Sequence, residues 1–129
     1  MRIYFIVKPL GSYALKKLQK SIEAIFDKKK DSLYLLSSLK KGHAIDLTQK
    51  AIQEKADLVV ACGGDGTINE VARGLVETEI PLAIIPLGSG NGIARHFKIP
   101  FEISKAIQLI KKNKIARLLF HKILKLPVN

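Results

Sequence analysis

The chain has 129 residues, a length that suits one domain with its own hydrophobic core. Lysine and arginine number 22 against 11 acidic residues, and the net charge of +11 favours anionic partners such as nucleotides, nucleic acids or acidic lipid surfaces. The single cysteine, Cys62, excludes a disulfide within the chain and favours a reducing compartment. No apolar run is long enough to span a bilayer and the first residues do not fit a signal peptide, so we expect a cytoplasmic protein.

Apolar runs and helical patterns follow one another along the chain. Four short apolar runs predict strands over residues 3–7, 33–36, 58–62 and 82–85. Apolar residues at helical spacing predict helices over about 14–30, 44–55, 68–76 and 103–113, with a short helix near 93–95. Strands that alternate with helices predict an α/β fold, a three-layer α/β/α sandwich with a mostly parallel, Rossmann-like sheet.

The stretch Leu58–Glu70 joins a predicted buried strand to a predicted helix through three glycines. Glycines let the backbone turn sharply and approach a ligand closely. Thr67, with Glu70 three residues later, fits a capping box and is the expected N-cap of the helix. Because a helix N-terminus after a strand presents free N–H groups to an anion, we expect a phosphate site at this turn.

A second glycine loop, Leu87–Gly92, follows the fourth predicted strand. In open α/β sheets, ligands bind beyond the carboxyl ends of the strands. The loops at Lys8-Pro9 and Ser38–His43 also follow strands, so we expect four polar loops to line one cleft. No stretch matches a Walker A loop, and neither glycine loop has the dinucleotide-binding spacing, which argues against a plain Rossmann dehydrogenase.

Asp65 lies inside the first glycine loop. A carboxylate there repels phosphate unless a divalent cation intervenes or the carboxylate faces an incoming hydroxyl. Phosphoryl transfer uses both devices, Mg²⁺ to neutralise charge and an acidic residue to accept a proton from the nucleophile. Asp65 is therefore our candidate for that role. The alternative is that Asp65 only makes an Asx turn, and the second glycine loop on the same edge weakens that alternative.

Three elements in the expected order resemble the diacylglycerol kinase catalytic domain family, which includes bacterial lipid kinases and sphingosine kinases. Gly63–Thr67, followed by Asn69-Glu70, resembles the GGDGT signature, which the more distant NAD kinases and phosphofructokinases share. Pro86–Arg95 resembles the family's second loop element. Ser38–Ala44 resembles its T-x-x-x-G-H-A element, with serine in place of threonine. The resemblance covers roughly residues 3 to 113.

The resemblance implies a lipid kinase that uses ATP and Mg²⁺ and acts on diacylglycerol or a related lipid at a membrane surface. Asp65 would be the catalytic residue and would help to activate the acceptor hydroxyl, while no residue is assigned as a direct metal ligand. His43 and Arg95 are secondary candidates; the alternatives are a hydrogen-bonded structural histidine beside a helix start and an arginine in a surface salt bridge. The expected nucleotide contacts are Lys8, Ser38, Gly64, Gly66, Thr67, Gly88, Ser89 and Asn91.

The sequence departs from the family at several positions. Lys8 stands where the family has an asparagine, and Gly92 stands where bacterial members usually have an aspartate. The family also continues into a β-rich second domain. We therefore assign residues 1–113 to the nucleotide-binding domain and residues 114–129 to a tail that precedes an absent second domain. The tail pattern permits a basic amphipathic helix or a strand with a turn, and an apolar tail or an exposed sheet edge would favour homo-oligomers.

Three other functions are weighed against the lipid kinase. One is a nucleotide-binding module without catalysis, because half of the cleft would be missing. Another is a small-molecule kinase of the NAD kinase type, which shares GGDGT but gives no reason for Gly88–Arg95. A nucleic-acid binder is the last; the charge permits it, but no recognised motif supports it. We therefore expect a nucleotide and a lipid as partners, and no nucleic acid.

Overall fold

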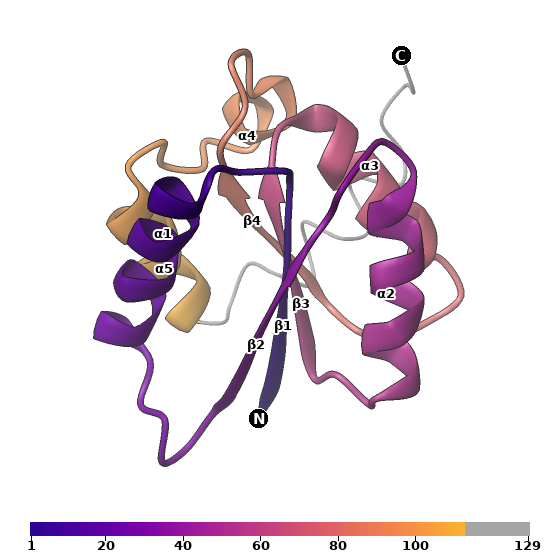
Figure 1. Ribbon diagram of the computed structural model, residues 1–129, viewed down its shortest axis with the longest axis horizontal. Coiled ribbons are helices and arrows are strands. Elements are labelled where there is room, and N and C mark those ends of the chain that lie inside the picture. Colours follow the sequence, from indigo (N-terminus) through magenta and orange to yellow (C-terminus); the bar gives the residue numbers. More distant parts are fainter. Residues whose placement is uncertain (113–129) are drawn as a thin grey trace.

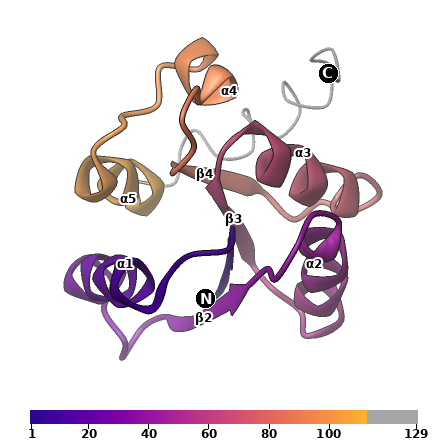
Figure 2. The ribbon, with the colours of Figure 1, turned by 45° about the horizontal axis from the view of Figure 1, so that its top comes forward.

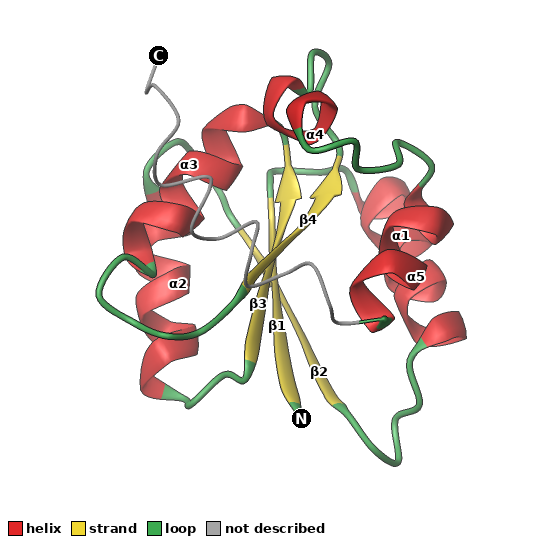
Figure 3. Ribbon diagram, turned by 180° about the vertical axis from the view of Figure 1, so that it is seen from behind, coloured by secondary structure: helices red, strands yellow, loops and turns green. Residues whose placement is uncertain are grey.

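The computed structural model describes residues 1–112, in which four strands and five helices form three layers (Figure 1). The helices α1 and α5 cover one face of the sheet and α2 and α3 cover the other, while α4 lies beyond the end of β4 (Figures 1 and 3). This arrangement confirms the three-layer α/β fold; the tail over residues 114–129 lies outside the described residues. In chain order the elements are β1 (Arg2–Val7), α1 (Ser12–Ile25), β2 (Ser32–Ser37), α2 (His43–Gln53), β3 (Leu58–Gly63), α3 (Asp65–Gly74), β4 (Leu82–Pro86), α4 (Gly92–His96) and α5 (Ile103–Lys111).

The four strands are all parallel and pair in the order β2-β1-β3-β4. Phe5 in the middle of β1 is opposite Leu35 of β2 and Val60 of β3. Because the strands point the same way, the loops that leave their carboxyl ends share one edge of the sheet, here called the carboxyl edge. The opposite edge, where the strands begin, is here called the amino edge. The expected convergence of four loops is therefore a consequence of the topology.

The continuous apolar runs of the strands are explained by burial on both faces. The helices α1 and α5 lie on one side of the sheet and α2 and α3 on the other (Figure 2). Along β1, Ile3 and Phe5 pack against the α1 and α5 side, whereas Tyr4 and Ile6 pack against the α2 and α3 side. None of these four side chains is exposed to solvent. Burial of one such side chain contributes roughly 1.5–3 kcal/mol, so the central strands anchor both layers of helices.

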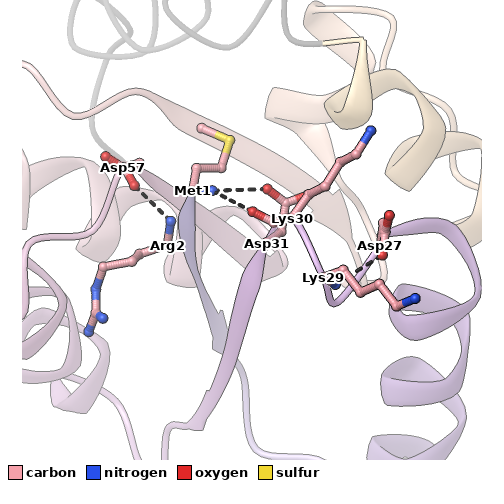
Figure 4. Close-up of polar contacts among 7 residues, drawn as sticks. All are labelled: Met1, Arg2, Asp27, Lys29, Lys30, Asp31 and Asp57. Carbon is pink, nitrogen blue, oxygen red and sulfur yellow. Dashed lines mark hydrogen bonds and ion pairs between the residues drawn. The ribbon is translucent and has the colours of Figure 1, made fainter.

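The first helix is shorter than its apolar spacing predicted, because α1 ends at Ile25 rather than near Lys30. Phe26 adopts an extended backbone and buries its ring against the sheet. Asp27 then forms a turn in which its carboxylate accepts the N–H of Lys29 at 2.9 Å (Figure 4). The lysines that follow Phe26 therefore lie in a connection, since a local side-chain bond competes with the helix.

The amino edge of the sheet is closed by polar contacts between its connections (Figure 4). The backbone N–H of Arg2 donates to the Asp57 carboxylate at 2.7 Å, and the amino terminus of Met1 donates to the Lys30 carbonyl at 3.0 Å. Met1 also pairs with the Asp31 carboxylate at 3.1 Å. These contacts satisfy polar groups at the start of β1.

Every helix within residues 1–112 is too short or too polar to cross a bilayer.

Cys62 in β3 is completely buried, which confirms that it acts as a small apolar core residue, and burial raises the pKa of its thiol. Because the thiolate is the reactive form, we expect no reaction of the folded protein with Ellman's reagent at about pH 8. Denaturant should make the thiol fully reactive. Fast labelling in the absence of denaturant would contradict the packing of β3.

Candidate functional site

A cleft of about 510 Å³ lies at the carboxyl edge of the sheet. Its walls come from the β1–α1, β2–α2, β3–α3 and β4–α4 loops, which are distant in sequence. All of the predicted catalytic and nucleotide-contact residues line it, although their roles in binding and chemistry stay predictions. These residues are Lys8, Ser38, Gly64, Asp65, Gly66, Thr67, Gly88, Ser89 and Asn91.

The helix α3 begins at Asp65, immediately after the strand β3, with Gly64 as its N-cap. The predicted capping box is wrong, because Thr67 lies inside the first turn and no side chain caps this helix end. Ile68 is the first residue whose N–H donates within the turn, to the Gly64 carbonyl at 3.1 Å. Within residues 1–112, the N–H groups of Asp65, Gly66 and Thr67 have no acceptor. These three residues line the cleft, so unpaired donors and the positive end of the helix dipole lie at its wall. This arrangement suits the binding of an anion.

The Asp65 carboxylate connects the two glycine loops. One of its oxygens accepts the N–H of Gly92 at 3.1 Å and the other accepts the N–H of Ile93 at 2.9 Å. These amides begin α4, so Asp65 caps that short helix and does not bond within its own turn. A Cβ atom on Gly92 would lie only 2.8 Å from Asp65 Oδ2. The glycine at position 92 therefore leaves room for the Asp65 carboxylate to reach α4.

The two glycine loops also touch through their backbones. A Cβ atom on Gly88 would lie 2.6 Å from the Gly64 Cα, a distance that real Cβ atoms do not show. Asn91 has a left-handed backbone, and its side-chain amide accepts the Gly88 N–H and donates to the Gly88 carbonyl, each at 2.8 Å. The Asn91 side chain thus closes its own loop, and its nucleotide contact stays a prediction. Glycine at both positions lets the second loop rest on the first.

Arg95 and His43 hold loops and do not line the cleft within the described residues. Arg95 Nε donates to the Gly90 carbonyl at 2.7 Å, and its guanidinium lies 5.0 Å from the centre of the Phe101 ring. His43 Nδ1 accepts the Leu39 N–H at 2.9 Å. The structural alternative for His43, a hydrogen-bonded residue beside a helix start, describes its observed contact. The alternative for Arg95 was a surface salt bridge; among residues 1–112 Arg95 makes no salt bridge and contacts a carbonyl and an aromatic ring instead.

The β2–α2 loop is held by contacts that sequence reasoning missed. Gly42 has a left-handed backbone with φ of 91°, and its N–H donates to the Glu70 carboxylate of α3 at 3.0 Å. Ser38 Oγ donates to the Lys40 carbonyl at 3.0 Å. Glu70 thus secures a loop that is 28 residues earlier in the chain. Lys40 and Lys41 also line the cleft, and the signal in the sequence was their place in the Ser38–His43 loop, which follows a strand.

The charges around the cleft suit a phosphorylated ligand with a divalent cation. Lys8, Lys40 and Lys41 line it together with the carboxylates of Asp65 and Glu70. Residues 1–112 contain no group of three or more side chains that could by themselves hold a metal. Mg²⁺ is usually held by one or two carboxylates plus substrate phosphates, so Asp65 fits a shared site. Each Asp65 oxygen accepts one N–H bond and retains a further lone pair.

Comparison with known proteins gives one consistent family. The sequence profile of the diacylglycerol kinase catalytic domain matches residues 2–123. The Pectobacterium atrosepticum protein named "Probable lipid kinase YegS-like" is 42% identical over 98 residues, which cover 71% of this chain and 33% of that protein. A Staphylococcus carnosus diacylglycerol kinase is 36% identical over 73 residues, covering 55% of this chain and 24% of that protein.

A solved structure supports the same grouping. The crystal structure of a diacylglycerol kinase from Bacillus anthracis str. Sterne superposes with a TM-score of 0.68 and 32% sequence identity. The superposition covers 87% of this chain and 39% of that one. The chain spans about a third or less of the length of the curated relatives described above.

The contact between the glycine loops can be tested with a matched pair of alanine substitutions. We expect Gly88→Ala to lower the free energy of unfolding by about 1–3 kcal/mol, because its Cβ would overlap the Gly64 backbone. Gly90→Ala is the control, since its Cβ would meet no atom within 4 Å. Urea unfolding followed by circular dichroism measures both. Equal stability of the two variants would contradict the contact.

Proposed function

Because the chain belongs to the diacylglycerol kinase catalytic domain family, we propose that it is the nucleotide-binding half of an ATP-dependent lipid kinase. The reaction is transfer of the terminal phosphoryl group of ATP to the hydroxyl of diacylglycerol or a related lipid. One observation supports the proposal most strongly, namely that four loops distant in sequence place the nine predicted site residues around one cleft. Unpaired N–H groups at the start of α3 lie in the same wall.

The backbone of the first glycine loop is proposed to hold the phosphates of ATP. The unpaired N–H groups of Asp65, Gly66 and Thr67 supply donors, and the side chain of Lys8 supplies a positive charge. A Cβ on Gly66 would meet nothing within 4 Å, so this part of the wall is open to a ligand. Side chains in place of these glycines would prevent the phosphates from approaching the backbone N–H groups closely.

The second glycine loop and the β2–α2 loop are proposed to hold the rest of the nucleotide. Ser89 and Ser38 line the cleft with hydroxyl groups. The Ser38 hydroxyl donates to the Lys40 carbonyl and so offers a ligand its acceptor lone pair, whereas the Ser89 hydroxyl is able to donate and to accept. Gly88 keeps the second loop close to Gly64, and Asn91 keeps it closed. These contacts fix the distance between the two sides of the nucleotide site and so orient the terminal phosphoryl group.

Asp65 is proposed to act in catalysis as well as in holding α4. The oxygens that accept N–H bonds from Gly92 and Ile93 have further lone pairs for a cation or for the proton of the acceptor hydroxyl. Bound Mg²⁺ would neutralise the charge of the phosphates, and Asp65 with the phosphate oxygens would hold it. The capping bonds keep the carboxylate in one orientation, so it does not need to rearrange during the reaction.

A non-catalytic nucleotide-binding module is the second candidate function, because the chain covers only 33% of its Pectobacterium relative. An NAD kinase-like activity is the third. We expect ATP with Mg²⁺ to raise the melting temperature by several degrees and adenosine to raise it less, because adenosine lacks phosphates. Incubation with ATP and either diacylglycerol vesicles or NAD then identifies the acceptor.

Each outcome of that experiment supports one of the three candidate functions or contradicts all of them. Phosphorylated lipid supports the kinase, and nucleotide binding without transfer supports the non-catalytic module. Transfer to NAD and not to lipid supports the third candidate. A melting temperature that ATP leaves unchanged would contradict all three.

Substitution of Asp65 tests its chemical role. We expect Asp65→Asn to reduce phosphoryl transfer by about 100-fold or more, because an amide cannot accept the proton as a carboxylate does. The amide oxygen can still accept the Ile93 N–H, but the amide nitrogen cannot accept the Gly92 N–H, so the melting temperature should fall by a few degrees while the fold is kept. Asp46→Asn, in an exposed position of the first turn of α2, is the matched control and should keep full activity. Undiminished transfer by Asp65→Asn would remove Asp65 from the mechanism.

A further inference from the structure

We propose that the ammonium group of Lys8 is a fixed cation in the wall of the cleft and allows the site to hold the phosphates of a nucleotide without a divalent cation. The inference rests on the proposed function and deepens it, because it states which form of the nucleotide the site accepts. Any lysine near the mouth of the cleft would attract an anion. Replacing part of the charge of Mg²⁺, in contrast, requires a lysine that is held in place beside the phosphates.

The Lys8 side chain reaches from the end of β1 to the second glycine loop. Its backbone N–H donates to the Cys62 carbonyl at 2.9 Å, so the residue extends the pairing of β1 with β3. Its Nζ donates to the carbonyl of Leu87, the residue before Gly88, at 3.4 Å. Because Leu87 donates its own N–H to the Gly63 carbonyl at 2.9 Å, the ammonium lies beside the place where the two glycine loops meet.

The Lys8 ammonium has charge and donors left for a ligand. Ion pairs within residues 1–112 involve the amino terminus of Met1, Lys28 and Lys105, and Lys8 forms none there. An ammonium offers several N–H donors, and the long bond to Leu87 uses only one of them. A half-buried charge has lost part of its hydration, so a phosphate oxygen that accepts the remaining donors would restore what burial removes.

The other charges that line the cleft differ from Lys8 in sign or in burial. Lys40 and Lys41 are exposed, so water and salt screen their attraction for an anion. Asp65 and Glu70 are half-buried carboxylates, which repel a phosphate in the same cleft. Among the described residues that line the cleft, only Lys8 is a half-buried cation. Lys8 therefore offsets part of the repulsion by the two carboxylates in a way that salt weakens little.

Lys8 and Mg²⁺ would act on the same phosphate charge. Free ATP carries more negative charge than its complex with Mg²⁺, so a neighbouring ammonium attracts the free form more strongly. The contribution of Lys8 to nucleotide affinity should consequently be larger without Mg²⁺ than with it. A residue that only shaped the loop would contribute equally in both conditions.

Isothermal titration calorimetry of the full 129-residue chain tests the inference. The ligands are ATP with Mg²⁺, ATP with EDTA, inorganic tripolyphosphate with EDTA, and adenosine. We expect the unsubstituted chain to bind ATP in EDTA within about tenfold of its affinity for ATP with Mg²⁺, and to bind adenosine far more weakly. A chain that binds ATP only when Mg²⁺ is present would overturn the inference and leave the proposed function supported.

A neutral variant then assigns the effect to Lys8. Lys8→Gln removes the charge but keeps a donor for the Leu87 carbonyl. We expect it to lower the affinity for ATP by about tenfold or more in EDTA and by about threefold or less with Mg²⁺. Lys29→Gln, in the connection after α1, makes the same change of net charge away from the cleft. It is the matched control and should bind both forms as the unsubstituted chain does.

Salt separates Lys8 from the exposed lysines of the cleft. At about 0.5 M salt, the loss of affinity caused by Lys8→Gln should persist, because salt screens a half-buried charge less than an exposed one. Any loss caused by Lys41→Gln at low salt should disappear under the same condition. Circular dichroism confirms that each variant is folded.

The outcomes separate this inference from the proposed function. Equal losses by Lys8→Gln with and without Mg²⁺, or no loss in EDTA, would overturn the role of Lys8 while nucleotide binding stands. Tripolyphosphate bound more tightly than ATP, with a loss on Lys8→Gln, would support the Lys8 cation while contradicting a nucleotide site. A chain that binds neither ATP nor tripolyphosphate would contradict both.

Discussion

The site depends on one set of contacts, those by which the Asp65 carboxylate and the Gly64–Gly88 approach hold two glycine loops together. Asp65 accepts two N–H bonds from the start of α4, and Gly64 and Gly88 meet backbone to backbone because neither has a side chain. The carboxylate therefore sits between two helix N-termini, its own at α3 and that of α4. Without these contacts the loops would have no fixed separation, and the cleft would lose one of its walls.

The parallel sheet supplies the frame on which these contacts form. The strands β3 and β4 are neighbours, so the loops after them leave the same edge side by side. The strands β1 and β2 add Lys8 and the β2–α2 loop, and Glu70 joins that loop to α3 across the sheet edge. The two edges are consequently different: polar contacts close the amino edge (Figure 4), whereas the loops of the carboxyl edge line a cleft.

Much of the fold could be predicted from the sequence, because the spacing of apolar residues indicates which faces of a strand or helix are buried. The continuous run Ile3–Val7 identified a strand buried on both faces, and the glycines around Asp65 identified the turn beside the helix. Contacts between distant residues could not be predicted in this way. Glu70 three residues after Thr67 matched a local capping pattern, but its carboxylate bonds to Gly42 instead. Likewise, the sequence could not predict that the Asp65 carboxylate accepts the Ile93 N–H, because this bond depends on how the sheet brings the two glycine loops together.

The proposed function requires that the unpaired N–H groups at the start of α3 bind the phosphates of a nucleotide. An amide NMR titration of the ¹⁵N-labelled chain with ATP and Mg²⁺ measures this binding, because it reports each N–H group separately. We expect the resonances of Asp65, Gly66 and Thr67 to shift together with those of Ser89 and Gly90, while the resonances of the amino-edge connections do not shift. Shifts confined to surface lysine regions, with the first glycine loop unchanged, would contradict the proposed function.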